Sequence, residues 1–133
     1  MTERQLYRNR IRKKIPKGRR AWVQSQDQYA CVFCGSRGPL SMDHVVPVQD
    51  CLDQGYCRYT INHPINLVTA CFLCNTVRVH DQPKVMRYGR FSANPTRFDR
   101  YLKLTRLAMK ALEESLAAQG EHYANTHERR SDR

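Results

Sequence analysis

The stretch MDHVVP, residues 42–47, places an acid and an imidazole side by side in an apolar segment. Asp43 and His44 are costly choices in a buried strand, which favours residues such as Val45 and Val46. Adjacent strand residues point to opposite faces. A carboxylate suits a hard cation such as Mg²⁺ or Mn²⁺, and a neutral imidazole suits a general base near pH 7. The pair therefore indicates metal-assisted catalysis or, alternatively, a hydrogen-bonded pair at a strand edge.

Two Cys-x-x-Cys pairs enclose this stretch: Cys31 with Cys34, and Cys71 with Cys74. Two residues between thiols let both sulfurs reach one ion, and two such pairs complete a tetrahedral zinc site. Four thiolates leave no open position, so this zinc would be structural. We predict that it clamps the two ends of the 36-residue segment between the pairs. The alternative, four ordinary buried cysteines, is disfavoured by the doubled spacing.

Three further candidate ligands lie between the pairs. Cys51 and Cys57 flank LDQGY in a loop and belong to no paired motif. We interpret them as free thiols in preference to metal ligands. His63 directly precedes Pro64 and is interpreted as a loop residue.

The segment NLVTACFLCNTVRVH predicts a helix with an asparagine near its start. Asn66 and Asn75 lie nine residues apart, at opposite ends of about two and a half turns of this helix. Asn75 directly follows Cys74, so a zinc ion would hold it in place.

The other elements suit a small α+β fold. KGRRAWVQSQDQY predicts a short helix anchored by Trp22 and Val23. ACVFCGS predicts a strand with a tight turn at Gly35, and GPLSMDHVVPV predicts a second strand that ends at Pro47. Residues 49–64 are expected to form a loop.

The clearest helix is NPTRFDRYLKLTRLAMKALEESLAAQG, with Asn94 as N-cap, Pro95 at its first position and Gly120 as its terminator. Its core or partner face follows a period near 3.6 residues. That face comprises Phe98, Tyr101, Leu102, Leu104, Thr105, Ala108, Met109, Leu112 and Leu116. The chain thus divides into an arm at 1–20, a zinc-clamped core at 21–90, the helix at 94–120 and a polar tail at 121–133, expected to be disordered.

The positive charge of the chain is concentrated at its start. The 133 residues carry a net charge of +11, and residues 1–20 hold nine Lys or Arg against the single acid Glu3, which gives +8. A basic block of this kind commonly binds nucleic acid, although it can also be a solvated tail or a targeting address. The candidate phosphate contacts are Arg12, Lys13, Lys14, Lys17, Arg19 and Arg20.

The sequence gives no indication of a membrane protein. No run approaches the roughly 20 apolar residues of a membrane span, and the N-terminus lacks the apolar stretch of a secretory signal. We therefore expect a cytoplasmic protein with no membrane partner. In that compartment the six cysteines favour metal ligands or free thiols over disulfides.

Together, CVFCG, MDHVVP and NLVTACFLCN resemble the HNH endonuclease family, the ββα-metal nucleases. The resemblance covers roughly residues 29–78, a little over a third of the chain. The zinc pairs, Asp-His, Asn-Leu-Val and Cys-Asn follow the order found in the family. The loop before the last segment departs from the family, because it lacks the usual double glycine and carries Cys51 and Cys57 instead.

The resemblance implies a role for each matched residue. His44 would be the general base that activates water, and Asp43 would ligate the catalytic Mg²⁺ or Mn²⁺. Asn66 would form hydrogen bonds within the loop and help to hold the histidine. Asn75, where the family often has a histidine, would be the second metal ligand. Arg78 would meet a phosphate.

These residues predict metal-dependent hydrolysis of phosphodiester bonds in DNA, by nicking or by double-strand cleavage. The alternative is a non-catalytic zinc module that binds nucleic acid, and the intact Asp-His-Asn-Asn set favours the enzyme. A place in a larger phage or mobile-element machine is compatible with the enzyme. In that case the C-terminal helix would dock a protein partner.

Overall fold

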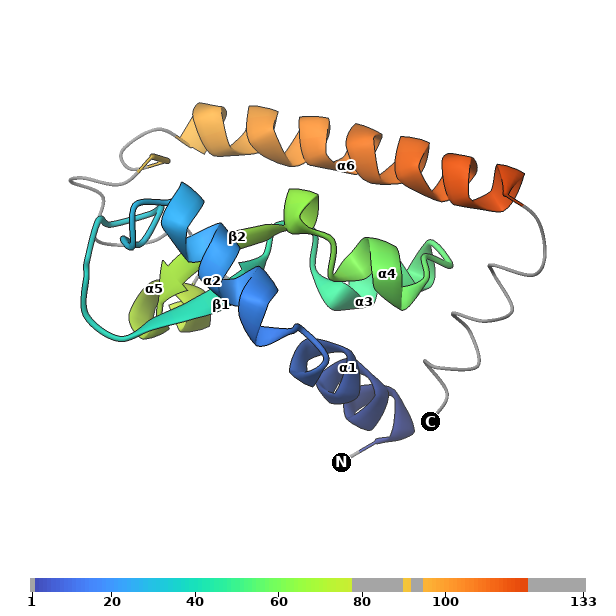
Figure 1. Ribbon diagram of the computed structural model, residues 1–133, viewed down its shortest axis with the longest axis horizontal. Helices are drawn as coiled ribbons and strands as arrows, with labels where there is room; N and C mark the ends of the chain where they lie inside the picture. The colour runs from blue at the N-terminus through green and yellow to red at the C-terminus, as the bar shows by residue number, and fades with distance from the viewer. Residues whose placement is uncertain (1, 78–89, 92–94, 120–133) are drawn as a thin grey trace.

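The structure is a computed structural model that describes residues 2–77, 90–91 and 95–119. Within these residues it shows the expected small α+β architecture, with a two-stranded antiparallel sheet (Figure 1). The strands are β1 (Leu40–His44) and β2 (Leu67–Cys71). Their register pairs Asp43 with Val68 and His44 with Leu67. The helices are α1 (Glu3–Lys13), α2 (Lys17–Gln26), α3 (Val48–Asp53), α4 (Arg58–Ile61), the 3₁₀ helix η1 (Pro64–Asn66), α5 (Phe72–Val77) and α6 (Pro95–Ala118).

Strand β2 corrects the sequence-based prediction, which placed Asn66 and Asn75 on one helix. All five residues of β2 are buried, and the run includes the β-branched Val68 and Thr69. A short, wholly buried apolar run has neither the period of a helix nor that of a half-buried strand, so the pattern alone does not distinguish them. Within the described part of the predicted helix, residues 72–77 form α5. Asn66 therefore ends η1, before β2, and Asn75 lies on α5, after it.

The predicted strand at residues 30–36 is also wrong, because the first cysteine pair lies in a turn. The Gly35 N–H donates to the Cys31 carbonyl oxygen at 2.9 Å, and Gly35 has φ +80°, which glycine adopts readily. Val32 is bonded like a strand residue. Its N–H donates to the Thr69 carbonyl oxygen at 3.0 Å, and its carbonyl oxygen accepts from the Phe91 N–H at 2.8 Å. The turn is thereby fixed to the edge of β2.

Residues 49–64 form two short helices and the start of η1, where a loop was predicted. Val48, Cys51 and Ile61 are buried in one cluster that also contains Val46, so apolar side chains tie the segment down. Gly55 separates the two helices with φ +78°. The apolar positions were too few to predict helices, because each helix is only one or two turns long.

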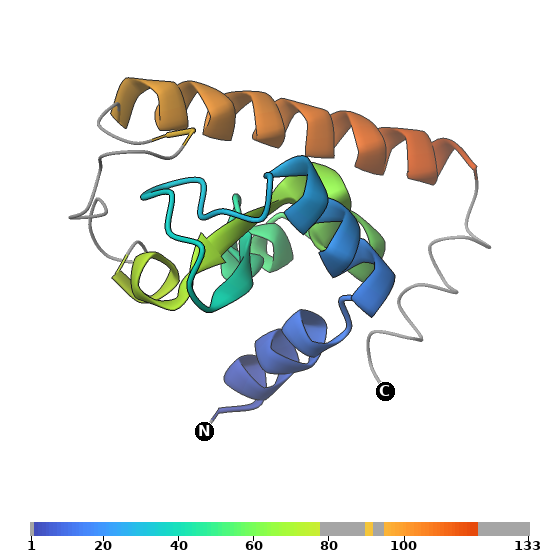
Figure 2. The same ribbon diagram turned by 60° about the vertical axis from the view of Figure 1, so that its left-hand side comes forward.

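Helix α6 is confirmed, and it covers one side of the molecule along its length (Figures 1 and 2). Leu102 packs against two core clusters, one around the cysteine pairs and one around α3 and α4. Thr105, Met109 and Leu116 are buried as predicted, whereas Leu104 and Ala108 are exposed. Asn94, Gly120 and the tail at 121–133 lie outside the described residues.

The basic arm is an integral part of the fold. The hydroxyl of Thr2 caps α1 by accepting from the Gln5 N–H. Ile11 and Ile15 are buried, at 1% and 6% exposed, so the arm contributes to the core. In α2 the predicted anchor Val23 is buried, but the other predicted anchor, Trp22, is 54% exposed. None of the helices in the described ranges has the length and apolar character needed to cross a membrane.

Candidate active site and metal centre

The four paired cysteines form one cluster, as the spacing predicted. The sulfur atoms of Cys31, Cys34, Cys71 and Cys74 lie within 4.8 Å of one another. The Sγ atoms of Cys34 and Cys71 are 3.7 Å apart. Tetrahedral zinc with bonds of about 2.3 Å sets its sulfurs roughly 3.8 Å apart. The cluster could therefore hold one metal ion such as zinc.

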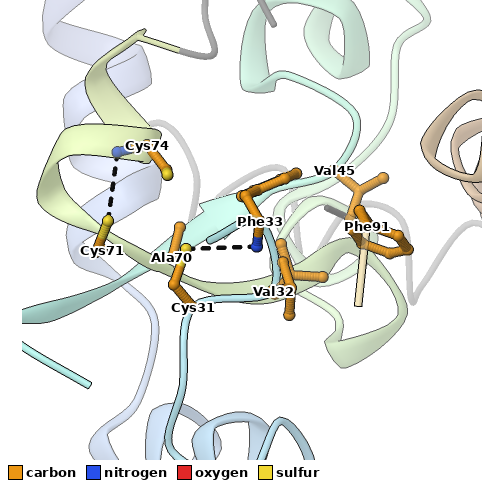
Figure 3. Packing of buried hydrophobic residues seen from close by; sticks show 9 residues of the cluster. Cys31, Val32, Phe33, Val45, Ala70, Cys71, Cys74 and Phe91 are labelled. Carbon is orange, nitrogen blue, oxygen red and sulfur yellow. Dashed lines mark hydrogen bonds between the residues drawn. The ribbon is translucent and has the colours of Figure 1, made fainter. Parts of the chain in front are cut away.

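Backbone donors support the sulfur atoms (Figure 3). The Phe33 N–H donates to Cys31 Sγ at 3.4 Å, and the Cys74 N–H donates to Cys71 Sγ at 3.5 Å. Such bonds stabilise a thiolate. At Cys71, burial alone raises the thiol pKa, but the Cys74 N–H and the neighbouring cysteines outweigh it and lower the pKa.

Two other thiols of the cluster, Cys34 and Cys74, resist ionisation. Burial raises the pKa of Cys34, and burial together with the charge of Cys31 raises the pKa of Cys74. Four negative charges at this spacing repel one another, so a full set of thiolates requires a cation. The chemistry of the cluster thus suits a thiolate-bound metal.

Cys51 and Cys57 lie outside this cluster, and their interpretation as free thiols stays a prediction. Burial raises the pKa of Cys51 to about 12, and the thiol donates to the Val46 carbonyl oxygen at 3.6 Å. His63 is a loop residue that caps η1, with its Nδ1 accepting from the Ile65 N–H at 3.2 Å. Burial and the charge of Arg19 lower the pKa of His63.

Asp43 and His44 end β1, at 8% and 7% exposed. His44 Nε2 lies 2.8 Å from Asn62 Oδ1, and Asn62 Nδ2 donates to the Ile11 carbonyl oxygen at 2.8 Å. Because a carbonyl oxygen only accepts, it fixes the orientation of the Asn62 amide. Nε2 of His44 must therefore carry a proton. In a neutral ring this leaves Nδ1 with the lone pair that a general base needs.

Asn62 is a site residue that the sequence analysis missed. It is 2% exposed and lies 18 residues from His44 and 51 from Ile11 along the chain. No motif or spacing marks it in the sequence. The amide oxygen and the amide nitrogen of Asn62 are both hydrogen-bonded to distant residues. Its role is therefore visible only in the folded structure.

Asn66 holds the backbone that follows His44. Its side chain is fully buried, and Oδ1 accepts from the Val46 N–H at 2.7 Å. Its Nδ2 donates to the carbonyl oxygens of Val46, at 3.2 Å, and Ile61, at 3.0 Å. The side chain thus joins the end of β1 to the end of α4, which is consistent with a loop-holding role.

Asn75 lies against β1, bonded to the two residues that precede Asp43. Its Nδ2 donates to Ser41 Oγ at 2.9 Å and to the Met42 carbonyl oxygen at 3.3 Å. The two bonds use both hydrogens of the amide nitrogen. Oδ1 is therefore the atom that Asn75 can offer to a cation, and an amide oxygen suits a hard metal ion.

The predicted phosphate contacts fall into three groups. Lys14, Lys17 and Arg20 are exposed. Arg19 is half-buried, and its Nη1 donates to the Asn62 carbonyl oxygen at 3.0 Å. Arg12 and Lys13 belong to the last turn of α1, and Arg78 lies outside the described residues.

Comparison with known proteins gives no relative: no family model, curated protein or solved structure matches the chain. The function must therefore be argued from the site. The fold gathers the four predicted ligands of one metal. It also gathers the predicted catalytic residues around the end of β1. Asp43 and His44 lie on the strand itself. Asn75 is bonded to the backbone just before this pair, and Asn66 is bonded to the backbone that follows it.

Proposed function

We propose that this protein is a metal-dependent endonuclease of the ββα-metal type that hydrolyses phosphodiester bonds in DNA. The carrying observation is that β1 ends with Asp43 and His44, and that Asn75 of α5 is bonded to the two residues before Asp43. The hydrogen-bonding of His44 supports the proposal, because Asn62 leaves Nδ1 as the basic ring nitrogen.

In this proposal His44 takes the proton from the water that attacks the phosphorus atom in line with the leaving oxygen. Asp43 and the Oδ1 atom of Asn75 would hold Mg²⁺ or Mn²⁺, and such an ion would supply positive charge to the scissile phosphate. Two protein ligands leave room for water and phosphate oxygens around such an ion. Asn66 keeps the loop after His44 in place through its bonds to Val46 and Ile61.

The four-cysteine cluster is proposed to bind one structural zinc ion. Cys71 ends β2, and Cys74 directly precedes Asn75 on α5. A zinc ion held there would fix the start of α5 against the turn at Cys31 and Cys34. It would thereby hold Asn75 against β1 without taking part in hydrolysis.

DNA would contact the positive arm. Lys14, Lys17 and Arg20 are exposed around the junction of α1 and α2, in a segment of charge +8. Contacts between such side chains and phosphates position a protein on DNA and carry little sequence information. We therefore propose that the arm supplies binding and that any sequence preference has another source.

Two observations bear on the other predictions. The low exposure of Asp43 and His44, at 8% and 7%, favours the alternative of a zinc-binding nucleic-acid module without catalysis. A protein partner on α6, as in a phage or mobile-element machine, would cover Leu104 and Leu107, which are 58% and 65% exposed.

The proposed function is tested by incubating supercoiled plasmid with the protein in Mg²⁺, in Mn²⁺ and in EDTA. Nicked or linear product should form only with a divalent ion, and Asp43→Ala should abolish it. Plasmid that the protein binds but leaves intact in both metals would support the non-catalytic module.

A further inference from the structure

We infer that Asn62 is a positioning residue for His44 and that the N-terminal arm holds Asn62 in place. This inference rests on the proposed function, since it assigns His44 as the base. The geometry is a chain of bonds of 2.8 Å each, from the Ile11 carbonyl oxygen of α1 to Asn62 Nδ2, and from Asn62 Oδ1 to His44 Nε2. The backbone of α1 is thus linked to the imidazole ring of His44 through the side chain of Asn62.

Burial makes this orientation persistent. Asn62 is 2% exposed and Ile11 is 1% exposed, so water has little access to replace either bond. If the amide turned over, Oδ1 would face the Ile11 carbonyl oxygen, and two acceptors would meet in a buried place. Asn62 therefore presents an acceptor to His44 at all times, and this keeps the proton on Nε2.

Arg19 provides a second support. Its guanidinium donates from Nη1 to the backbone carbonyl oxygen of Asn62 at 3.0 Å, while Ile11 holds the side chain of the same residue. Asn62 is thus fixed by α1 through its amide and by α2 through its backbone. Arg19, predicted from sequence as a phosphate contact, belongs to the support of the base.

The arm consequently has two functions in one segment. Its exposed cations Lys14, Lys17 and Arg20 are available to phosphates, while Ile11 and Arg19 point into the protein and hold Asn62. Movement of the arm on DNA would be transmitted to His44 through Asn62. Loss of the contacts that hold Asn62 should therefore reduce turnover. Loss of the exposed cations should reduce the affinity for DNA.

The tautomer of His44 can be measured without any cleavage assay. In ¹⁵N NMR spectra of the full chain, His44 should show a protonated Nε2 and an unprotonated Nδ1, and its signals are assigned by their loss in His44→Gln. Asn62→Leu removes the acceptor at similar volume and should mix the two tautomers. Asn62→Asp keeps an oxygen toward Nε2 and should retain the Nε2 proton, although it loses the bond to the Ile11 carbonyl oxygen. A pure Nε2-H tautomer in Asn62→Leu would overturn the role of Asn62.

Kinetics test the support from the arm, using two arginines that each donate from Nη1 to a backbone carbonyl oxygen. Arg19 Nη1 donates to the Asn62 carbonyl oxygen, and Arg37 Nη1 donates to the Gln28 carbonyl oxygen, both at 3.0 Å. At saturating DNA, Arg19→Ala should lower kcat by about 10-fold, within the loss of up to about 10²-fold that a slightly misplaced group produces. Arg37→Ala should leave kcat unchanged.

The outcomes separate this inference from the proposed function. Equal kcat for Arg19→Ala and the wild type would overturn the support from the arm. A wild type that never cleaves DNA but shows the Nε2-H tautomer, lost in Asn62→Leu, would contradict the nuclease while supporting the contact. Since Arg19 is half-buried and polar, its alanine variant should fold even if Asn62→Leu does not.

Discussion

The Sγ atom of Cys34 lies 3.7 Å from the Sγ atom of Cys71, although 37 positions separate the two residues in the chain. The first cysteine pair lies in a turn on the edge of β2, and the second joins β2 to α5. The contact therefore closes the segment that contains Asp43, His44 and Asn66. Interactions that keep the four sulfurs together therefore also keep the candidate active site in place.

The first prediction concerns zinc content and stability. Elemental analysis should give one zinc per chain, and Cys74→Ser should lose the zinc and unfold at a lower temperature, because binding energy at such a site is folding energy. Cys57→Ser is the matched control, since Cys57 lies outside the cluster. A Cys74→Ser protein with full zinc and an unchanged melting temperature would contradict the assignment.

The second prediction concerns Asn66. Asn66→Ala leaves the Val46 N–H and the Ile61 carbonyl oxygen without their partner, in a place where Asn66 is 0% exposed. Each unsatisfied group should cost about 1–3 kcal/mol in the free energy of unfolding, measured in urea. Gln54→Ala, at an exposed position of the same segment, should change that free energy little. Equal losses in the two variants would show that the bonds of Asn66 do not hold the loop.

The third prediction concerns the exposed charges of the arm. Replacing Lys14, Lys17 and Arg20 by alanine should weaken DNA binding at all sequences alike. The slope of log affinity against log salt should become shallower by roughly 0.9 for each lost phosphate contact. The substitutions leave Ile11, Ile15 and Arg19 in place, so folding and turnover at saturating DNA should be preserved.

The control for this variant removes the same charge elsewhere. Arg100, Lys103 and Lys110 are exposed on α6, and their replacement by alanine should leave the salt slope nearly unchanged. If the two triple variants shift the slope equally, the effect reflects net charge alone and the arm has no special place in binding.

The fourth prediction concerns Cys51 and alkaline pH. Burial raises the pKa of Cys51 from 9.0 to about 12, so the unfolded chain loses this proton at a lower pH than the folded chain does. Stability from the buried thiol is fully present below pH 9 and is lost as the pH rises toward 12. The free energy of unfolding should therefore fall less steeply between pH 9 and 11 in Cys51→Ala than in the wild type. Parallel curves would contradict the burial of this thiol.

The sequence predicted the parts whose signals are local. The doubled Cys-x-x-Cys spacing located the four-sulfur cluster, and the apolar period with a proline at its start located α6. It failed at β2, because LVTAC is buried on every side and has no period that distinguishes a strand from a helix. The prediction also failed at the first cysteine pair, where residues 30–36 were predicted to be a strand and form a turn.

The supports of His44 could not be predicted for a different reason. Asn62 meets Ile11 across 51 residues and Arg19 across 43, and neither contact leaves a spacing that a motif could record. The arm was separated from the core in the sequence-based prediction because positive charges dominate the composition of residues 1–20. Ile11 and Ile15 are buried residues that anchor it, and isolated isoleucines among cations give a weak signal.

The central claim is tested most directly by the rate of plasmid cleavage in Mg²⁺ for wild type and His44→Ala, at equal zinc content and equal DNA binding. Loss of a general base should slow cleavage by about 10²–10⁴-fold. His122→Ala, a histidine that the proposed site does not use, should cleave at the wild-type rate. Equal rates for wild type and His44→Ala would contradict the account.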